Sequence, residues 1–512
     1  MILSVSATLV LSLLVASAAV ATTYYVDSVE GSDGHPGTRE SAAWRTLEKV
    51  NGTTFAPGDR ILLRSGREWT GQLWPKGSGA PGKPITVDCY GEGPRPAVHA
   101  RGKHFEALHL RDQQGWEISN LELTNRGPEG PAPRDGVRIL GETGGRLSHI
   151  HLRSLDVHDV NGHNTDGRDA GKCNAGILFD VTGRERRTWF DDVVIEGCYV
   201  HQCDRSGIKT WTDWSRLDPA GWAPYTDLVI RGNRVDDIGG DGIIACMANA
   251  PLIEHNIACR CNMRSGLWNV AIWVWECDDA VIQFNEAFLT RTTKDGQGFD
   301  IDGRCRRTIV QYNYSHDNEG GFILLCETGD PDPRLFNDSS IVRYNISQND
   351  GARVFQVGGK VTHARIYNNV IFVSEGAGDP LMIWHNADGV WPDGIHYSNN
   401  IFVNLGAGGF DLGKSTNTAF DHNVFFGHHD GTEPDDLGKL TDDPKFVAPG
   451  AGGVGRRAVD GYRLRPDSPC LDSGVTIPDN GGRDYWGNPV PSGSGTDRGA
   501  YEHPARSRQS NA

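Results

Sequence analysis

Two short alternating segments near the middle of the chain carry side chains suited to chemistry on a sugar. They are residues 271–275 (AIWVW) and 298–302 (GFDID). Successive side chains of a β-strand point to opposite faces. The residues predicted to point inward are Ile272, Val274, Phe299 and Ile301. The residues predicted on one shared outer face are Trp273, Trp275, Asp300 and Asp302. Carboxylates beside aromatic platforms are what a sugar-cleaving site needs.

The acidic pair has a spacing that suits acid/base catalysis. Asp300 and Asp302 are two residues apart on one strand, so their Cα atoms should lie about 6.6 Å apart. Carboxyl groups about 6.5–9.5 Å apart fit an inverting glycosidase, in which one protonates the leaving oxygen and the other activates water. Glu276 and Glu327 follow neighbouring strands and are alternative catalytic partners. The structural alternative is a solvated acidic strand followed by exposed turn glutamates.

Aromatic and basic residues nearby are candidates for binding the substrate. Trp273 is predicted to stack on a sugar, and Trp275 either does the same or packs beneath an insertion. The basic candidates are Lys209, Lys294, His316 and His385. If the reaction is an elimination, one of these would abstract a C5 proton. In that alternative Asp295, Asp300, Asp302 or Glu327 would hold Ca²⁺ through oxygen ligands.

A recurring asparagine indicates which architecture positions these residues. It lies within short phrases rich in Val, Ile, Phe and Tyr, at intervals of 23 to 32 residues. The positions are Asn233, Asn256, Asn285, Asn313, Asn345, Asn369, Asn400 and Asn423. Such a period indicates a solenoid, propeller or array. Because no helical stretch separates the strands, a parallel β-helix is predicted, with Asn stacked at a recurring turn.

A second phrase repeats in phase and should form the strand column of the candidate face. It recurs at residues 135–140, 175–180, 206–211, 241–246, 297–302, 320–325 and 408–413. The predicted outward positions are Lys209, Ile244, Trp273, Asp300, Ile323 and Asp411. Functional residues of a solenoid collect on one such face. Insertions at 163–174 and 210–225 are expected there, and the second, with three tryptophans, would wall a groove.

The chain divides into five predicted segments. They are a signal peptide (1–21), an N-terminal cap (22–104), the β-helix (105–430), a C-terminal cap (431–503) and a disordered tail (504–512). An apolar run followed by an Ala-Val-Ala cleavage site indicates export, and no later stretch is long enough to span a membrane. The net charge of −16 argues against nucleic-acid binding. The mature protein is expected to be secreted and monomeric.

The eleven cysteines are an odd number, so at least one thiol should lack a partner within the chain. Four of them follow outward strands of the repeated column: Cys246, Cys277, Cys305 and Cys326. On stacked coils these would form a buried ladder, or one disulfide between coils.

The ends and repeats together resemble a known superfamily. The motifs are the segment from Tyr24 to Asp59, the in-phase coils, and the closing segments 443–447, 462–474 and 497–502. With these, the chain resembles secreted right-handed parallel β-helix proteins of the pectate-lyase-like superfamily. The resemblance implies the fold and carbohydrate activity. It does not fix the reaction, since that superfamily includes hydrolases, lyases, epimerases and adhesins.

The sequence therefore predicts a secreted glycoside hydrolase that cleaves a polysaccharide or oligosaccharide without a cofactor. Two alternatives stay open. One is a Ca²⁺-dependent lyase or epimerase acting on uronic-acid chains, and the other is a glycan-binding surface protein without catalysis.

Overall fold

The protein is described by a computed structural model at residues 21–130, 132–164, 172, 174–219, 221–265 and 268–504. The predicted signal peptide and the predicted tail lie almost wholly outside these residues. None of the helices in the described part of the chain has the length and apolar character needed to cross a bilayer.

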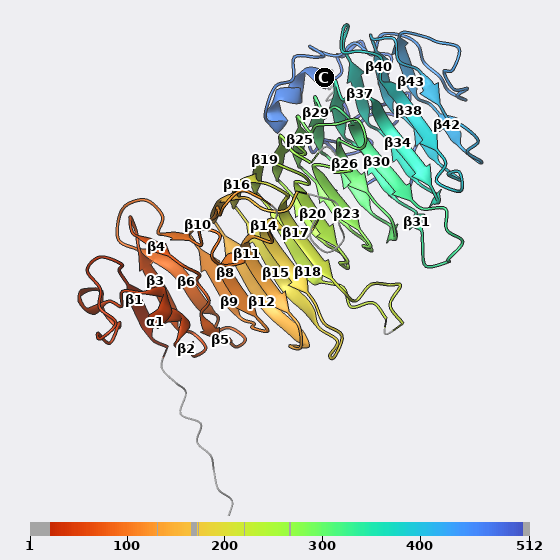
Figure 1. Ribbon diagram of the computed structural model, residues 1–512. Helices are drawn as coiled ribbons and strands as arrows, with labels where there is room; N and C mark the ends of the chain where they lie inside the picture. Colours follow the sequence, from red (N-terminus) through yellow and green to blue (C-terminus); the bar gives the residue numbers. More distant parts are fainter. Residues whose placement is uncertain are drawn as a thin grey trace, which may run out of the picture.

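The strands stack in three long parallel sheets (Figure 1). The first has 14 strands, from β1 (Thr23–Val26) to β42 (Ala419–Asp421). The second has 13, from β4 (Glu68–Thr70) to β43 (Val424–Gly427). The third has 11, from β8 (Glu106–Arg111) to β41 (Phe410–Asp411). Each sheet follows chain order, because the chain visits the sheets in turn on successive coils. The predicted parallel β-helix is confirmed.

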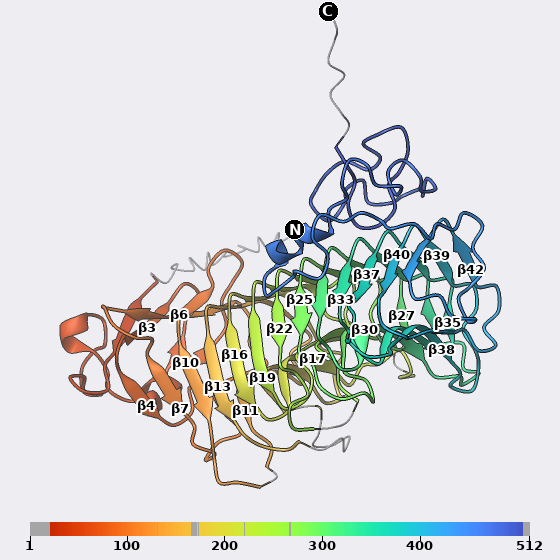
Figure 2. The same ribbon diagram turned by 90° about the horizontal axis from the view of Figure 1, so that it is seen from above.

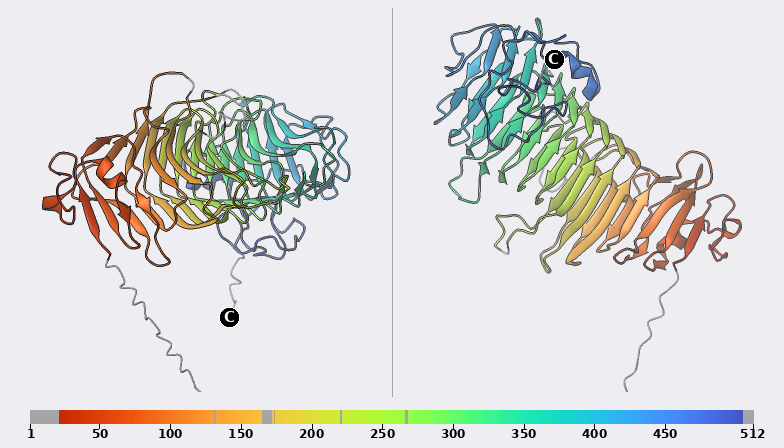
Figure 3. Two further views of the ribbon diagram at one scale, coloured as in Figure 1. Left: turned by 60° about the horizontal axis from the view of Figure 1, so that its bottom comes forward. Right: turned by 180° about the vertical axis from the view of Figure 1, so that it is seen from behind.

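The third sheet contains every phrase of the predicted strand column. Between β8 and β41 its strands are β11 (Asp135–Gly141), β14 (Ala175–Val181), β17 (Ser206–Thr212), β20 (Ile243–Cys246), β23 (Ile272–Trp275), β26 (Gln297–Ile301), β30 (Gly321–Glu327), β34 (Arg353–Gly359) and β38 (Leu381–Asn386). Figure 3 shows from two further sides how these coils form one elongated stack.

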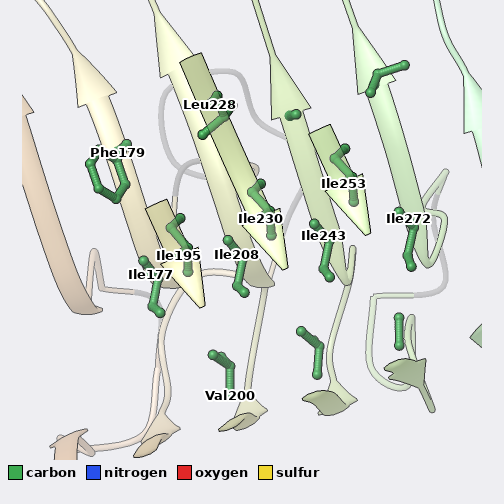
Figure 4. Packing of buried hydrophobic residues seen from close by; sticks show 14 of the residues in the cluster. Ile177, Phe179, Ile195, Val200, Ile208, Leu228, Ile230, Ile243, Ile253 and Ile272 are labelled. Carbon is green, nitrogen blue, oxygen red and sulfur yellow. The ribbon is translucent and has the colours of Figure 1, made fainter. Parts of the chain in front are cut away.

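The core runs through the middle of the coils. In the third sheet Ile177, Ile208, Ile243 and Ile272 occupy successive paired positions and are fully buried. Figure 4 shows this row facing isoleucines of the first sheet. The inward orientation predicted for Ile272, Val274, Phe299 and Ile301 is confirmed, since all four belong to the main core.

One predicted outward residue is wrong by a single position. Ile323 pairs with Phe299 and is buried in the core, whereas Leu324 pairs with Asp300 and faces out. A shift of one residue on a strand moves the side chain to the other face of the sheet.

The repeated asparagines form the predicted ladder, at the corner between the first and second sheets. The backbone N–H and the Nδ2 of Asn256 donate to Oδ1 of Asn285, at 2.9 and 3.0 Å. Asn285 donates in the same way to Asn313, at 2.9 and 3.1 Å. The residue before each of these three has a positive φ, between 50° and 60°. The buried amides therefore hold a left-handed corner that recurs on each coil.

Both predicted caps contain elements that join the coils. β1, β3 (Arg60–Arg64) and β6 (Ile85–Tyr90) belong to the first sheet. The N-terminal cap also contains one short helix, α1 (Leu47–Asn51), with Leu47 buried. The boundary between the N-terminal cap and the β-helix stays a prediction.

The C-terminal segment first closes the last coil and then turns back. The backbone N–H of Leu440 donates to the carbonyl of Asn423, which covers the end of the stack. The rest of the segment, including η2 (Arg456–Tyr462), packs on tyrosines and other apolar residues outside the second sheet (Figure 2). It therefore covers the side of the β-helix as well as its end.

Candidate active site

A pocket of about 470 Å³ lies over β23, β26, β30 and β34, on the outer face of the third sheet. Its carboxyl groups are Asp295, Asp300, Asp302, Glu327 and Asp388. Its aromatic lining residues are Trp268 and Trp275. The structure thus brings carboxyls and indoles together where the alternating pattern predicted them, although not all of the predicted residues take part.

Strand register sets the floor of this pocket. Trp273, Asp300 and Leu324 are paired across β23, β26 and β30 and point away from the core. Asp300 is only 3% exposed, and its Oδ1 is buried without a hydrogen-bond partner among the described residues. Burial raises the pKa of Asp300 well above its usual value, and the charges of Asp302 and Asp295 raise it further. This environment therefore favours the neutral form of the carboxyl.

Asp302 follows β26 and lies beside the next coil. Its Oδ1 accepts hydrogen bonds from the backbone N–H of Gly303, at 2.6 Å, and from the Cys326 thiol, at 3.2 Å. Ligating atoms of Asp300, Asp302 and Cys326 lie within 4.8 Å of one another. No described residue is hydrogen-bonded to the second oxygen of Asp302, Oδ2, so it is available to a water or a substrate.

Asp295 lies in the loop that leads into β26. Burial raises its pKa to about 7, with a further increase from the negative charge of Asp302. The guanidinium of Arg353 donates to the backbone carbonyls of Thr293 and Asp295, at 2.6 and 3.3 Å, and so fixes the loop. A carboxyl with a pKa near the working pH is suited to proton transfer.

Asp295 had been predicted only as a metal ligand of the lyase alternative. The sequence signal that identifies it is its place in a Gly-containing loop, KDGQG, directly before the strand that carries Asp300 and Asp302. Strand alternation does not extend into a loop, so this pattern did not single it out.

Glu276 needs correcting as a catalytic candidate. It is fully buried and does not line the pocket. Its carboxylate accepts from the Ser215 hydroxyl, at 2.9 Å, and forms an ion pair with Arg304, at 3.2 Å. Glu276 therefore anchors the insertion at 210–225 to the coil.

Glu327 does line the pocket, but backbone groups hold both of its oxygens. Oε2 accepts from the N–H of Arg304 and Oε1 from the N–H of Thr328, each at 2.7 Å. It stays a candidate for binding substrate more than for moving a proton.

The tryptophans also differ from prediction. Trp273 is only 6% exposed, and its Nε1 donates to Asp241 at 3.0 Å. The ammonium of Lys172 lies 4.9 Å from its ring centroid. The prediction of Trp273 as a sugar platform is therefore wrong, because the indole is buried with the Lys172 ammonium over its ring.

Two other indoles line the pocket. Trp275, as predicted, lies on this face, but its ring stacks on Trp211, at 5.4 Å between centroids, and contacts the guanidinium of Arg304. Trp268 is 56% exposed and was not predicted, since its loop shows no periodicity. Trp268 is therefore the indole with a surface open to a sugar.

Most predicted basic residues lie away from the pocket. Lys209 is 1% exposed and donates to the carbonyl of Lys172, at 2.7 Å. His316 is on β29 (Tyr314–His316) of the second sheet. Burial lowers its pKa, but the hydrogen bonds that it donates to Asp317 and Glu286 outweigh burial and raise the pKa to about 9.

The two remaining basic candidates also differ in position. His385 faces the core, with Nε2 2.9 Å from the Tyr397 hydroxyl. Lys294 alone is near the pocket, with its ammonium 5.2 Å from the Trp268 ring centroid. Lys209 and His316 are therefore corrected as substrate-binding residues, and His385 is corrected as a basic candidate for proton abstraction.

The cysteine ladder contains no disulfide among the ten cysteines that the structure describes. Cys277 and Cys305 lie in the core, and the N–H of Cys277 is 3.4 Å from the Cys305 sulfur. Cys246 packs outside the core beside Trp273, while Cys326 reaches Asp302. Cys173, the eleventh cysteine, lies outside the described residues.

The donor set of the pocket does not fit the Ca²⁺ of the lyase alternative. Ca²⁺ takes six to eight oxygen ligands. The cluster offers only two carboxyls, those of Asp300 and Asp302, together with the Cys326 thiol, which is not an oxygen ligand. The positive charge of Lys172 also acts on Asp295 and Asp300.

The insertion at 210–225 forms a second pocket of about 420 Å³ beside the first. Trp211, Ser215 and Leu217 line it, and it shares Trp275 and Arg304 with the first pocket. The predicted groove wall is thus present, although Trp214 is buried in the core. Most of the insertion at 163–174 lies outside the described residues.

Comparison with known proteins agrees with this fold. No family model matches the chain. A curated lacto-N-biosidase of Bifidobacterium longum subsp. longum is 27% identical over 593 aligned positions, which cover 92% of this chain and 36% of that protein. The chain thus spans about a third of the length of that relative.

Comparison with solved structures also finds similarity to a lacto-N-biosidase. The GH136 lacto-N-biosidase of Eubacterium ramulus superposes with a TM-score of 0.61 at 25% identity, covering 76% of this chain and 68% of that one. A complex of XylC with xylose, at 11% identity and a TM-score of 0.50, covers 95% of this chain and 99% of that one and supports the fold alone. The chain is therefore a parallel β-helix protein that is similar in sequence and structure to lacto-N-biosidases.

Proposed function

We propose that the chain is a glycoside hydrolase that cleaves an oligosaccharide in the pocket between Trp268 and Asp302. The observation that carries the proposal is the carboxyl cluster, in which burial raises the pKa of Asp295 to about 7 beside the hydrogen-bonded carboxylate of Asp302. Neighbouring carboxyls whose environments separate their pKa values are typical of acid/base pairs.

Each carboxyl has a role that follows from its surroundings. Asp295 protonates the leaving glycosidic oxygen. Asp302 acts on the anomeric carbon, either directly or through a water held at Oδ2. Asp300 is buried on the pocket floor, where its raised pKa favours the neutral form. This assignment keeps Asp302 of the predicted pair and replaces Asp300 by Asp295 as the acid.

Other residues bind and orient the sugar. Trp268 offers an exposed indole face at the pocket. Gln356 and Asn386 line the far side and are linked by a hydrogen bond of 3.2 Å. A Cβ atom at position 358 would lie 2.9 Å from Oδ1 of Asn386. Any residue larger than Gly358 would therefore displace the Asn386 amide.

The similarity to lacto-N-biosidases suggests the substrate. We propose an oligosaccharide that carries a lacto-N-biose unit, with the cleaved bond beside Asp302 and the remainder towards Trp211. Secretion, predicted from residues 1–21, and a monomeric state remain part of the proposal.

The test is the mass of the products from a panel of oligosaccharides, with and without lacto-N-biose units. Hydrolysis gives fragments whose summed mass exceeds that of the substrate by one water for each bond cleaved. Unsaturated fragments without added water would contradict the proposal and favour elimination. A chelator should leave the rate unchanged.

A further inference from the structure

A separate pocket of about 540 Å³ opens at the other end of the third sheet. It lies over β8 and β11, and the segments at Trp74, at 102–105 and at 132–134 form its rim. Five strand spacings separate β11 from β26 in the sheet order. At about 4.8 Å each, this is about 24 Å, so the pocket is distinct from the carboxyl cluster.

The lining of this pocket is cationic, although the chain carries a net charge of −16. The basic residues of the lining are Lys103, His104, His109, Arg111, Arg134 and Arg138. Glu106 is the only acidic residue among them. A local excess of one charge in a concave surface attracts ligands of the opposite charge.

Two of these cations are free to meet a ligand. Lys103 is exposed, and neither it nor Arg134 forms an ion pair with any residue that the structure describes. Arg134 donates instead to the amide oxygen and carbonyl of Asn161, at 2.9 and 3.2 Å, which hold it in place. A buried guanidinium held by neutral groups keeps its charge for an incoming anion.

The other charges are largely satisfied within the protein. Arg138 donates to Asp180 at 2.6 Å, yet its Nε–H is buried without an acceptor among the described residues. Glu106 accepts from the Gln72 amide at 2.8 Å and lies 3.1 Å from Nδ1 of His109. Among the described residues, Glu106 forms ion pairs with His109 and Arg138, and none with Lys103 or Arg134.

Aromatic surface lies on the same rim. Phe105, two residues after Lys103 along the chain, is 60% exposed. The Trp74 indole meets His109 edge-on, at 4.9 Å between centroids, and also lines the pocket. An exposed aromatic ring beside cations suits a ligand that combines a sugar ring with an acidic group.

We infer that this pocket is a second, non-catalytic binding site for an acidic sugar, a ring that carries a carboxylate or a sulfate. Lys103 and Arg134 bind the anionic group, and Phe105 packs on the ring. The site would hold an acidic glycan at about 24 Å from the carboxyl cluster. It stands independently of the reaction proposed there.

Calorimetric titration of the full chain with a glucuronic-acid-terminated oligosaccharide tests this inference. Two further ligands are the same oligosaccharide with glucose in place of glucuronic acid and the same oligosaccharide with a sulfated terminal sugar. Inorganic sulfate alone is the ion control. We expect both acidic sugars to bind at least about tenfold more tightly than the neutral one. Equal affinities, or sulfate alone binding as tightly as the sugars, would overturn the inference.

Two variants place the site. Lys103→Glu should weaken the acidic sugar about tenfold or more, and Phe105→Ala should weaken both acidic sugars. Lys83→Glu, which changes an exposed lysine outside the pocket by the same charge, is the matched control and should have no effect. Unchanged binding in Lys103→Glu, with the folded state confirmed by its unfolding midpoint, would contradict the assignment.

Discussion

The asparagine ladder and the carboxyl cluster are both polar and buried, yet they are satisfied in opposite ways. In the ladder, Oδ1 of Asn313 accepts two hydrogen bonds from Asn285, and its own amide donates onward to Asn345 and back to Ile282. In the cluster, Oδ1 of Asp300 has no hydrogen-bond partner among the described residues. The same coils thus contain a polar column that is fully paired and a polar group that is not.

This difference in hydrogen bonding indicates that the ladder serves stability and the carboxyl cluster serves chemistry. A buried polar group without a partner costs about 1–3 kcal/mol, so it is retained only where the surrounding fold supplies the stability and the group has a use. The ladder contributes rigid corners on each coil. The cluster uses this rigidity to hold Asp295 and Asp300 where burial, and then the neighbouring carboxyls, raise their pKa values.

The largest expected effect is on the acid of the cluster. Asp295→Asn should lower kcat on an oligosaccharide by about 10³-fold, because the leaving oxygen is no longer protonated. With a nitrophenyl glycoside, whose leaving group needs no proton, the loss should be less than about tenfold. Equal losses on both substrates would contradict the role. Asp411→Asn, an exposed carboxylate on the same sheet, is the control.

Breaking the ladder should affect stability without affecting the site. Asn313→Leu leaves the N–H and amide of Asn285 without their acceptor, which should cost about 2–4 kcal/mol in the free energy of unfolding. Urea denaturation measures this loss. Activity at 20 °C should stay within about twofold of the unsubstituted protein. If Asn313→Leu lost activity while keeping its stability, the claim that the ladder serves stability and not activity would be refuted.

The pH dependence of the rate sharpens the comparison. Because Asp295 must be protonated to act as the acid and burial raises its pKa to about 7, kcat/KM should fall as the pH rises above about 7. The charge of Lys172 lowers that pKa, so Lys172→Met should move the alkaline limb to higher pH. A shift to lower pH would contradict the assignment.

The smallest effect on activity is expected from substituting Asp300. Its pKa is raised by burial, so the folded protein keeps a proton that the unfolded chain loses, and stability should fall as the pH rises above about 4. Asp300→Asn removes this dependence and should be the more stable protein at pH 8. Its activity should fall by less than about tenfold. Denaturation at pH 5 and pH 8 compares the two proteins.

Much of the fold was predictable because it depends on periodic patterns. The Asn spacing and the alternation around Ile272 and Phe299 gave the ladder and the inward faces. The site was only partly predictable. Asp295 and Trp268 lie in loops, where alternation gives no orientation, and the ring of Trp273 is contacted by Lys172, a residue distant in sequence.

The same limit explains the basic residues. His316 and Lys209 have chemistry suited to proton abstraction, but tertiary contacts pair one with Glu286 and place the other beneath Lys172. Sequence shows the residue type and the strand, whereas partners contributed by other coils decide whether a side chain is available.

The most direct test of the central claim is the rate of oligosaccharide cleavage by Asp302→Asn, measured beside its urea unfolding midpoint. A carboxylate that acts in the reaction predicts a rate about 10³-fold below that of the unsubstituted protein, with an unchanged midpoint. A rate within about threefold, from a variant with the same midpoint, would contradict the claim that this cluster performs the reaction.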